Sequence, residues 1–417
     1  MSTIPFVYDH IEDFENRIIY YESSRGCPFS CSYCLSSIDK CLRFREIELV
    51  KKELQFFIDK KVPQVKFVDR TFNCRHDHAM AIWTYIHEHD NGITNFHFEV
   101  SADLLNEKEI ALINRMRPGL IQLEIGVQSS NEITIREINR TMKIDVLSTI
   151  VDKIKKGNNV HQHLDLIAGL PYEGYESFGK SFDRVYKMNP EQLQLGFLKV
   201  LKGSVMHDRA QEYGIVYQDR APYEVLSTKW LTYAEVIRLK QIEEMVEVYY
   251  NSGQFCCTMA ALEQEFASPF CMYECLAAYY DEKNAFAVSH SRIGRYEILY
   301  DFIVKTCKER SEQYMEMLTL DMYLRDNVKK RPEFLRESGV SSDEAAAFYK
   351  KEEKERTYLK AYEGYDRRQM RKMTHLERID GKTVLFDYKN RDPLTGNAAI
   401  YYLSELSLIH ISEPTRR

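Results

Sequence analysis

Apolar, β-branched runs alternate with segments of helical periodicity in the first half of this 417-residue chain. The runs are IIYYE from Ile18, VKFVD from Val65, FHFEV from Phe96, LIQLEIGVQ from Leu120, HLDLIAG from His163 and LQLGFLKV from Leu193. Between them, segments such as EIELVKKELQFFIDKK place their apolar residues on one helical face. Strands joined by single helices form right-handed βαβ units and a parallel sheet. Six such units are too few to close an eight-stranded barrel, so the sequence predicts an α/β fold, either a doubly wound sheet or an open partial barrel.

The pattern changes after about Thr228, where consecutive amphipathic helices replace the alternation and a strand pair, TVLFDYK and NAAIYYL, comes last. A chain of this length is expected to form two domains. We therefore predict a lead-in at 1–17, a core at 18–204, a linker at 205–227 and a mainly α-helical C-terminal domain at 228–406. Residues 407–417 break from the composition before them, and we expect a non-native tail without function.

Composition narrows the class of protein. Hydrophobic residues make up 44% and charged residues 29%, as in globular proteins. The net charge of −6 gives no general basic surface, so general nucleic-acid binding is not expected. The sequence contains no apolar run of membrane-spanning length and no signal peptide, and we expect a cytoplasmic protein without membrane contact. Ten cysteines in a reducing compartment are expected to be metal ligands or buried thiols, not disulfides.

The most informative motif is RGCPFSCSYC, which follows the first predicted strand and holds three cysteines spaced C-x3-C-x2-C: Cys27, Cys31 and Cys34. Loops at the carboxyl ends of parallel strands converge, and binding sites concentrate there. Three thiolates on a short loop can bind three irons of a four-iron cluster, which leaves the fourth iron open to a ligand. The alternative is a zinc site completed by Cys41 or by His76 and His78.

This spacing, with the aromatic Tyr33 before the third cysteine, resembles the radical S-adenosylmethionine (SAM) superfamily. The similarity extends from about Ile18 to Gly203. GVQSS, DLIAGLP and LKVLKGS look like strand motifs of the subgroup with oxygen-independent coproporphyrinogen III oxidase, the elongator-type acetyltransferase and the methylthiotransferases. The whole chain is similar to cobalamin-binding radical SAM proteins that end in an uncharacterised helical domain. The resemblance implies an open (β/α)6 TIM-like barrel.

The resemblance also implies a set of site residues. Cys27, Cys31 and Cys34 match the catalytic ligands of a [4Fe–4S] cluster. The residues that match the SAM-binding groups of the family are Tyr33, Asp69, Glu99, Gln128, Arg140, Asp165 and Gly169. Among them, Gln128 and Asp165 match groups that hydrogen-bond the ribose, and Arg140 matches the arginine that pairs with the methionine carboxylate. The second strand departs from the Gly-Gly-Glu pattern of the family, because Asp69-Arg70-Thr71 stands there.

The implied activity is reductive cleavage of SAM to start radical chemistry on an unidentified substrate, by hydrogen abstraction or, where cobalamin is supplied, by methyl transfer. The implied partner is an electron donor, flavodoxin or ferredoxin. Relatives usually carry a cobalamin domain before the barrel, whereas 26 residues precede Cys27 here, so we expect this chain alone not to bind cobalamin. The alternative function is a zinc-stabilised or iron–sulfur binding module without SAM chemistry.

Four cysteines of the helical half and two histidines near Asp165 each allow two interpretations. Cys256, Cys257, Cys271 and Cys275 lie in the helical half; core filling is the favoured interpretation, and an auxiliary metal site is the alternative. His161 and His163 are expected on the same side of their strand as Asp165, either hydrogen-bonded in the interior or lining a cavity.

Overall fold

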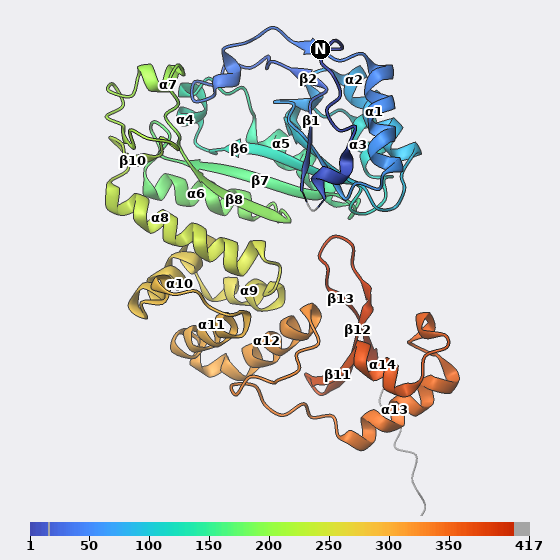
Figure 1. Cartoon of the computed structure of the whole chain (residues 1–417). Coiled ribbons are helices and arrows are strands. Elements are labelled where there is room, and N and C mark those ends of the chain that lie inside the picture. Colours follow the sequence, from blue (N-terminus) through green and yellow to red (C-terminus); the bar gives the residue numbers. More distant parts are fainter. Residues whose placement is uncertain (16, 404–417) are drawn as a thin grey trace, which may run out of the picture. The chain divides into compact units, whose positions relative to one another are not determined.

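The computed structural model of the chain describes residues 1–15 and 17–403, so the predicted tail at 407–417 lies outside the described residues (Figure 1). The chain divides into two compact units. The first comprises Met1–Asn251 and Phe266–Ala278, and the second comprises Ser252–Glu265 and Tyr279–Arg417.

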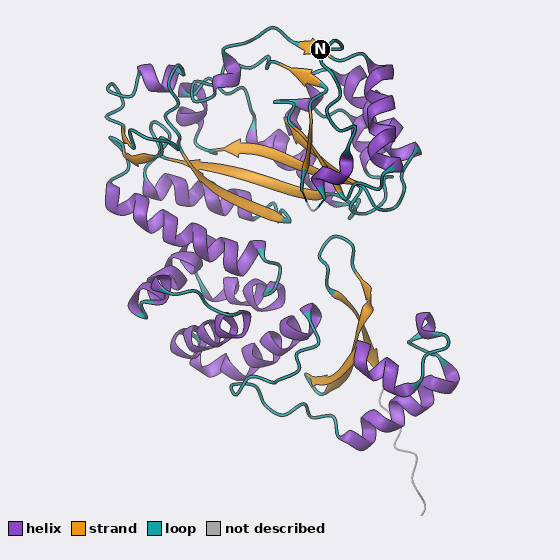
Figure 2. Cartoon of the chain, in the orientation of Figure 1, coloured by secondary structure: helices purple, strands orange, loops and turns teal. Residues whose placement is uncertain are grey.

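The first unit is built on a six-stranded parallel sheet, which confirms the predicted α/β class (Figures 1 and 2). Its strands are, in sheet order, β1 (Ile19–Tyr21), β4 (Gln64–Phe67), β5 (Asn95–Val100), β6 (Ile121–Gln128), β7 (His161–Ala168) and β8 (Gln192–Phe197). Its crossover helices are α1 (Ile47–Asp59), α2 (His76–Glu88), α3 (Glu107–Ile113), α5 (Ile144–Lys155) and α6 (Tyr175–Tyr186). The strands follow one another in sequence order with β1 and β8 at the edges, as an open partial barrel requires.

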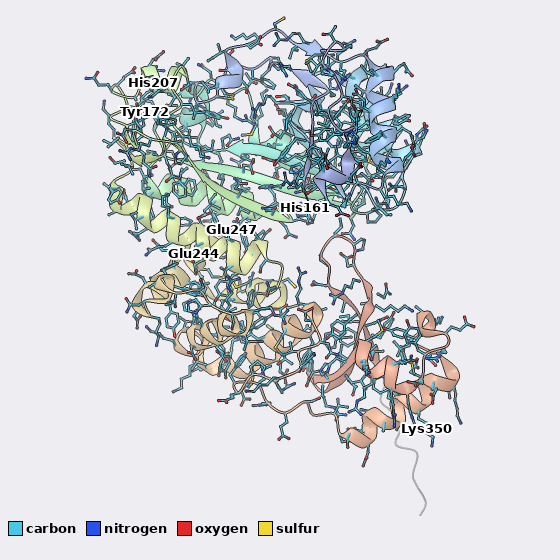
Figure 3. The ribbon with its side chains drawn as sticks, in the orientation of Figure 1. His161, Tyr172, His207, Glu244, Glu247 and Lys350 are labelled. Atoms are coloured by element: carbon cyan, nitrogen blue, oxygen red, sulfur yellow. The ribbon has the colours of Figure 1, made fainter. Side chains whose placement is uncertain are left out.

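The two faces of this sheet differ in polarity. Along β6, Ile121, Leu123, Ile125 and Val127 are fully buried, and α5 supplies further buried aliphatic side chains. The alternate residues of β6, Gln122, Glu124, Gly126 and Gln128, are only half-buried. They lie on the opposite face. The register aligns polar residues of neighbouring strands on that second face: Lys66, His97, Gln122 and His161 in one row, and Glu99, Glu124 and His163 in the next (Figure 3 labels His161 at the start of β7).

The segment 205–227, which was expected to be a linker, is part of the first unit. It contains α7 (Val205–Asp208) and the antiparallel pair β9 (Val216–Tyr217) and β10 (Val225–Ser227). α8 (Tyr233–Val246) and the π-helical turn Glu247–Asn251 also belong to this unit. The helical character expected after Thr228 therefore begins within the first unit.

The second unit combines helices with a small antiparallel sheet. Its helices are α9 (Cys256–Leu262), α11 (Arg292–Thr306), α12 (Ser311–Arg325), α13 (Ser342–Glu355) and α14 (Arg367–Met373), and α10 (Pro269–Glu282) is divided between the units. The sheet has the order β11 (Thr374–Ile379), β12 (Lys382–Arg391) and β13 (Ala398–Leu403). The sequence predicted β12 and β13 but missed β11, whose THLERI lacks a continuous apolar run. None of the helices in the described ranges is long and apolar enough to cross a bilayer.

A buried carboxylate joins three elements of the first unit. Glu173, in the turn from β7 to α6, accepts hydrogen bonds at Oε1 from Ser129 Oγ (2.7 Å) and Ser181 Oγ (2.8 Å). Its Oε2 has no hydrogen-bond partner among the described residues. Burial raises the pKa of Glu173 to about 7, although the two serine hydroxyls act against the rise. The folded protein therefore holds a proton here that the unfolded chain, with a Glu pKa of about 4.3, has released.

The unfolding free energy of Glu173→Gln, relative to that of the wild-type protein, is expected to increase as pH rises. Between about pH 4.3 and 7 the wild-type folded state binds the extra proton, so the contribution of Glu173 to the unfolding free energy falls with rising pH. The variant lacks this loss, and its unfolding free energy relative to wild type is expected to rise by about 2–3 kcal/mol from pH 5 to pH 8. Urea unfolding at both pH values measures the change. Glu176→Gln, at an exposed position three residues on, is the control, and the same pH response in both variants would contradict the assignment.

Candidate functional site

The three-cysteine loop is held in place by its backbone. Gly26 has φ +96°, and a Cβ there would lie 2.6 Å from the carbonyl oxygen of Cys41, so the close return of the chain requires glycine. The Cys27 amide donates to the Asp39 carbonyl at 3.3 Å. Ser32, between the second and third cysteines, donates its amide to Ile138 O (2.9 Å) and accepts from the Met206 amide (2.8 Å). These bonds attach the loop to three other parts of the first unit.

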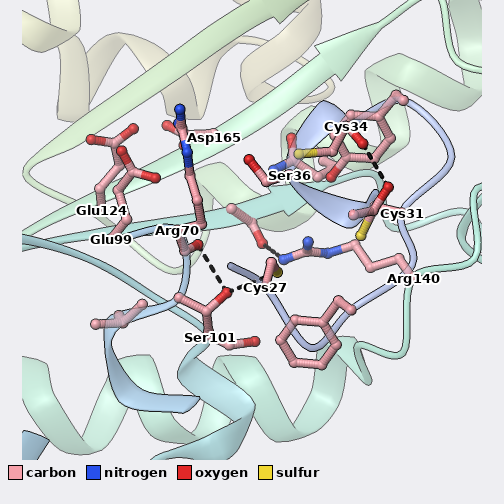
Figure 4. A pocket seen from close by; sticks show the side chains of 17 residues that line it. Cys27, Cys31, Cys34, Ser36, Arg70, Glu99, Ser101, Glu124, Arg140 and Asp165 are labelled. Atoms are coloured by element: carbon pink, nitrogen blue, oxygen red, sulfur yellow. Dashed lines mark hydrogen bonds between the residues drawn. The ribbon is translucent and has the colours of Figure 1, made fainter. Parts of the chain in front are cut away.

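The three thiols of this loop line one cavity (Figure 4). All three are free cysteines, and Cys27 and Cys31 are buried. The predicted residues that line the cavity with them are Tyr33, Glu99, Gln128, Arg140 and Asp165. Arg70, Thr71 and Glu124 line it too, although the sequence did not single out their side chains. For Arg70 and Thr71 the available signal was their position just after β4, and for Glu124 it was the alternation of polar and apolar residues along β6.

Arg140 is a half-buried cation that lines the cavity. Its Nη2 donates to the carbonyl of Gly126, while its Nε has no hydrogen-bond partner among the described residues. Burial acts to lower the pKa of Arg140, but Tyr33 and Cys31 outweigh it, and the guanidinium remains charged. Burial raises the pKa of the Cys31 thiol, and the charge and hydrogen bond of Arg140 act against that rise. Figure 4 shows the guanidinium directed toward the cysteines.

A β-bulge directs Gln128 into the cavity. Gly126 pairs with Asp165, but the next partner of β7, Leu166, pairs with Gln128, so Val127 is the extra residue. Gln128 has φ +72°, and its side chain folds back over Gly126, where a Cβ would lie only 2.3 Å from Gln128 Nε2. The buried Oε1 of Gln128 has no partner in the described structure. The bulge and the glycine together leave a hydrogen-bond acceptor available to a ligand.

Two neighbouring carboxylates of the cavity have opposite pKa shifts. Glu124 Oε2 lies 2.9 Å from His97 Nε2 and 3.0 Å from Lys66 Nζ. The close approach of the His97 imidazole, together with Lys66, lowers the pKa of Glu124 to about 2 against the effect of burial. Glu99 sits opposite Glu124 in the strand register, and burial followed by the charge of Glu124 raises the pKa of Glu99 to about 7. One carboxyl is thus ionised near neutral pH while the other can hold a proton, as in sites that separate acid and base roles.

His163 accompanies the third carboxylate, Asp165. The His163 Nε2 lies 3.0 Å from Asp165 Oδ1, and His163 is itself buried. Burial raises the pKa of Asp165, and His163 acts against the rise. His163 is thus buried with Asp165 close to it, whereas His161 at the start of β7 is only half-buried.

Two residues of the predicted set lie outside this cavity. Asp69 is fully buried and accepts from the Ser23 amide (2.9 Å), Ser23 Oγ (2.7 Å) and Ser24 Oγ (2.5 Å), so it connects the end of β4 to the residues that lead into the cysteine loop. Gly169 has φ +89°, and a Cβ there would meet Val225 Cγ1 at 2.8 Å, so close packing against β10 requires the glycine.

The residues of the zinc alternative are not gathered with the three cysteines. Cys41 is exposed, His76 Nδ1 lies 2.9 Å from Glu109 Oε1, and His78 Nε2 lies 3.0 Å from Ser23 Oγ. None of these three lines the cavity. Within the described ranges, the sulfur atoms of Cys27, Cys31 and Cys34 are also not gathered within 4.8 Å of one another, as ligands of one ion would be. A four-iron cluster takes each thiolate on a different iron, so the wider separation suits it.

Comparison with known proteins agrees with this geometry. Residues 21–185 match the radical SAM superfamily. The first unit carries a radical SAM domain. This match confirms the resemblance seen in the sequence. Separately, residues 211–393 match a family described as a protein of unknown function, DUF4080.

The individual relatives that match this chain are distant. Oxygen-independent coproporphyrinogen III oxidase of Salmonella typhimurium is 29% identical over 107 residues, which is 24% of this chain and 23% of that protein. Bacteriochlorophyllide d C-12(1)-methyltransferase of Chlorobaculum tepidum is 25% identical over 178 residues, 41% of this chain and 37% of that protein. The chain therefore spans well under half the length of these relatives. The radical SAM methyltransferase TsrM from Kitasatospora setae, solved with cobalamin and a [4Fe–4S] cluster, has a TM-score of 0.44 and 15% identity, with 52% of this chain and 41% of that chain covered.

Asp69→Ala is expected to destabilise the first unit. The substitution leaves the buried Ser23 amide and two buried hydroxyls without their acceptor, at a cost of about 2–4 kcal/mol in unfolding free energy. Asp69→Asn retains one acceptor oxygen and is expected to lose less. Urea unfolding measures both changes, with Asp219→Ala at an exposed position of the same unit as control. A loss in Asp69→Ala no larger than in the control would show that these bonds do not hold the loop.

Proposed function

We propose that the first unit holds a [4Fe–4S] cluster on Cys27, Cys31 and Cys34, binds SAM beside it and cleaves SAM reductively to start radical chemistry. The observation that carries the proposal is the meeting of three free thiols with a half-buried arginine and polar atoms that lack a partner among the described residues, all in one cavity of a radical SAM domain. When bound, the cluster supplies the electron that cleaves SAM into methionine and a 5′-deoxyadenosyl radical. An external reductant of the flavodoxin or ferredoxin type replaces that electron.

The protein groups of the cavity suit the polar parts of SAM. Arg140 presents a guanidinium, which favours a carboxylate such as that of the methionine moiety. Gln128 Oε1 and the Asp165 carboxylate present acceptors to hydroxyl groups such as those of a ribose. The two acceptors stand on the neighbouring strands β6 and β7. Gly126, two residues before Gln128, pairs with Asp165. These residues bind and orient the cofactor; they do not themselves supply electrons.

The chain also supplies a place for a proton. Glu99 lines the cavity with its pKa raised to about 7 by burial and by Glu124, so its carboxyl can hold or release a proton near neutral pH. Glu124, held ionised by His97 and Lys66, keeps negative charge beside it. The reaction that follows, hydrogen abstraction or methyl transfer, depends on a substrate that binds in or next to this cavity.

Formation of 5′-deoxyadenosine tests the proposed function. Full-length protein reconstituted anaerobically with iron and sulfide is expected to contain about four irons per chain and to form 5′-deoxyadenosine from SAM when dithionite is added. A zinc-stabilised binding module, the second candidate, would instead contain a single zinc ion and form no 5′-deoxyadenosine.

Replacement of any one of Cys27, Cys31 and Cys34 by alanine is expected to abolish the cluster. Each removes one of three protein ligands, and the brown iron–sulfur absorbance and the iron content measure the loss. Cys41→Ala is the matched control, because this exposed cysteine lies near the loop but does not line the cavity. Full iron content in Cys31→Ala would refute the ligand assignment.

Arg140→Ala is expected to weaken SAM binding while the cluster still assembles. Loss of one charged hydrogen-bonding group costs about 1.5–3 kcal/mol, which is roughly a 10- to 150-fold increase in the dissociation constant. Equilibrium binding of SAM to the reconstituted protein measures it. Arg136→Ala, an exposed arginine on α4 (Glu132–Glu137), is the control. Unchanged affinity in Arg140→Ala would assign the guanidinium another role.

A further inference from the structure

A second group of potential metal ligands lies in the second unit, apart from the residues that line the radical SAM cavity. Cys256 and Cys257 begin α9, and Asp321 lies on α12. One ligand atom from each of these three residues lies within 4.8 Å of the other two, and no other group of this kind occurs among residues 1–15 and 17–403. We propose that Cys256, Cys257 and Asp321 together bind one Zn²⁺ ion, with the fourth coordination position open to water.

The distances suit a tetrahedral ion. Cys256 Sγ lies 3.4 Å from Asp321 Oδ1. With Zn–S of about 2.3 Å and Zn–O of about 2.0 Å, tetrahedral angles separate a sulfur and an oxygen ligand by about 3.5 Å. The pair therefore needs little movement to share one ion. Two thiolates with one carboxylate are ligands that Zn²⁺ accepts, and three protein ligands plus water is a common arrangement for it.

The carboxylate is already oriented. Asp321 Oδ1 accepts from the Cys257 amide at 2.9 Å, and Asp321 Oδ2 accepts from the Thr258 amide at 2.8 Å. Hydrogen bonds of this kind fix a metal-binding carboxylate before the ion arrives. They also bring the end of α12 close to the residues that carry the two thiols.

The Asp321 carboxylate has no cationic side chain paired with it in the described chain. Asp321 is 1% exposed, and no lysine, arginine or histidine of the described chain forms an ion pair with it. By contrast Glu377, equally buried in the same unit, pairs with Arg331 at 2.8 Å. Buried carboxylates are normally paired or bound to metal.

The core-filling interpretation does not describe these two cysteines. Cys256 is exposed and Cys257 is half-buried, whereas the buried residues of α9 are Thr258, Met259 and Leu262. A capping role for Asp321 accounts for its two amide bonds but not for two adjacent thiols beside it. The open side of Cys256 gives an ion access from solvent.

Site-resolved protection of thiols tests the proposal in the full-length protein with its cluster assembled. Zn²⁺ is added up to one equivalent, and the rate of iodoacetamide labelling of each cysteine is read by mass spectrometry. Labelling of Cys256 and Cys257 is expected to slow together by at least about tenfold, because bound thiolates are poor nucleophiles. Cys41 and Cys307 in the same sample are expected to keep their rates. Unchanged rates at Cys256 and Cys257 would overturn the proposal.

Variants distinguish a three-ligand site from general thiol binding. Cys257→Ser is expected to abolish the protection of Cys256. Asp321→Asn, which retains an acceptor oxygen for one of the two amides, is expected to raise the Zn²⁺ concentration required by about 10- to 100-fold. Cys307→Ser, a half-buried cysteine of the same unit, is the matched control. Protection of Cys256 that persists unchanged in both Cys257→Ser and Asp321→Asn would also overturn the proposal. None of these variants touches the cluster loop, so the outcome is independent of SAM cleavage.

Discussion

The parallel sheet of the first unit buries one face against helices and keeps the other face polar. Alternation along β6 sends Ile121, Leu123 and Ile125 to the helices and Glu124 to the cavity side. Burial of the aliphatic face supplies the stability of the unit, and the same alternation leaves a row of ionisable groups on the opposite face. Because a one-residue slip would exchange the two faces, the register of each strand determines both the core and the site.

Local departures from the regular sheet then shape the cavity. The bulge at Val127 redirects Gln128, and Gly126 leaves the space into which that side chain folds. Asp69, although hidden from the cavity, holds Ser23 and Ser24 where the chain turns toward the cysteines. The geometry of the site therefore also depends on Asp69, which does not line the cavity.

The sequence predicted the sheet well because its information is local. Six apolar runs and the spacing of Cys27, Cys31 and Cys34 are visible without any knowledge of pairing. The interaction of Glu124 with His97 and Lys66 could not be predicted, because it depends on the register between three strands. Asp69 was expected beside the cofactor on the basis of its position in the strand motif, but its side chain points to the two serines. Residues 205–227 were predicted to be a linker because of their polar, irregular composition. Residues 228–251 were assigned to the C-terminal domain because of their helical pattern, and neither feature reveals that both segments belong to the first unit.

The hydrogen bonds of Ser32 have a consequence for the loop that carries the three thiols. Its amide and carbonyl are both engaged, with Ile138 and Met206, between two of the three thiols. The backbone between the second and third thiols is therefore held by contacts within the folded unit. The thiols are thus presented by contacts with residues far from them in the sequence. A substitution that displaces the backbone of Ile138 or Met206 would alter the loop while leaving all three cysteines in the chain.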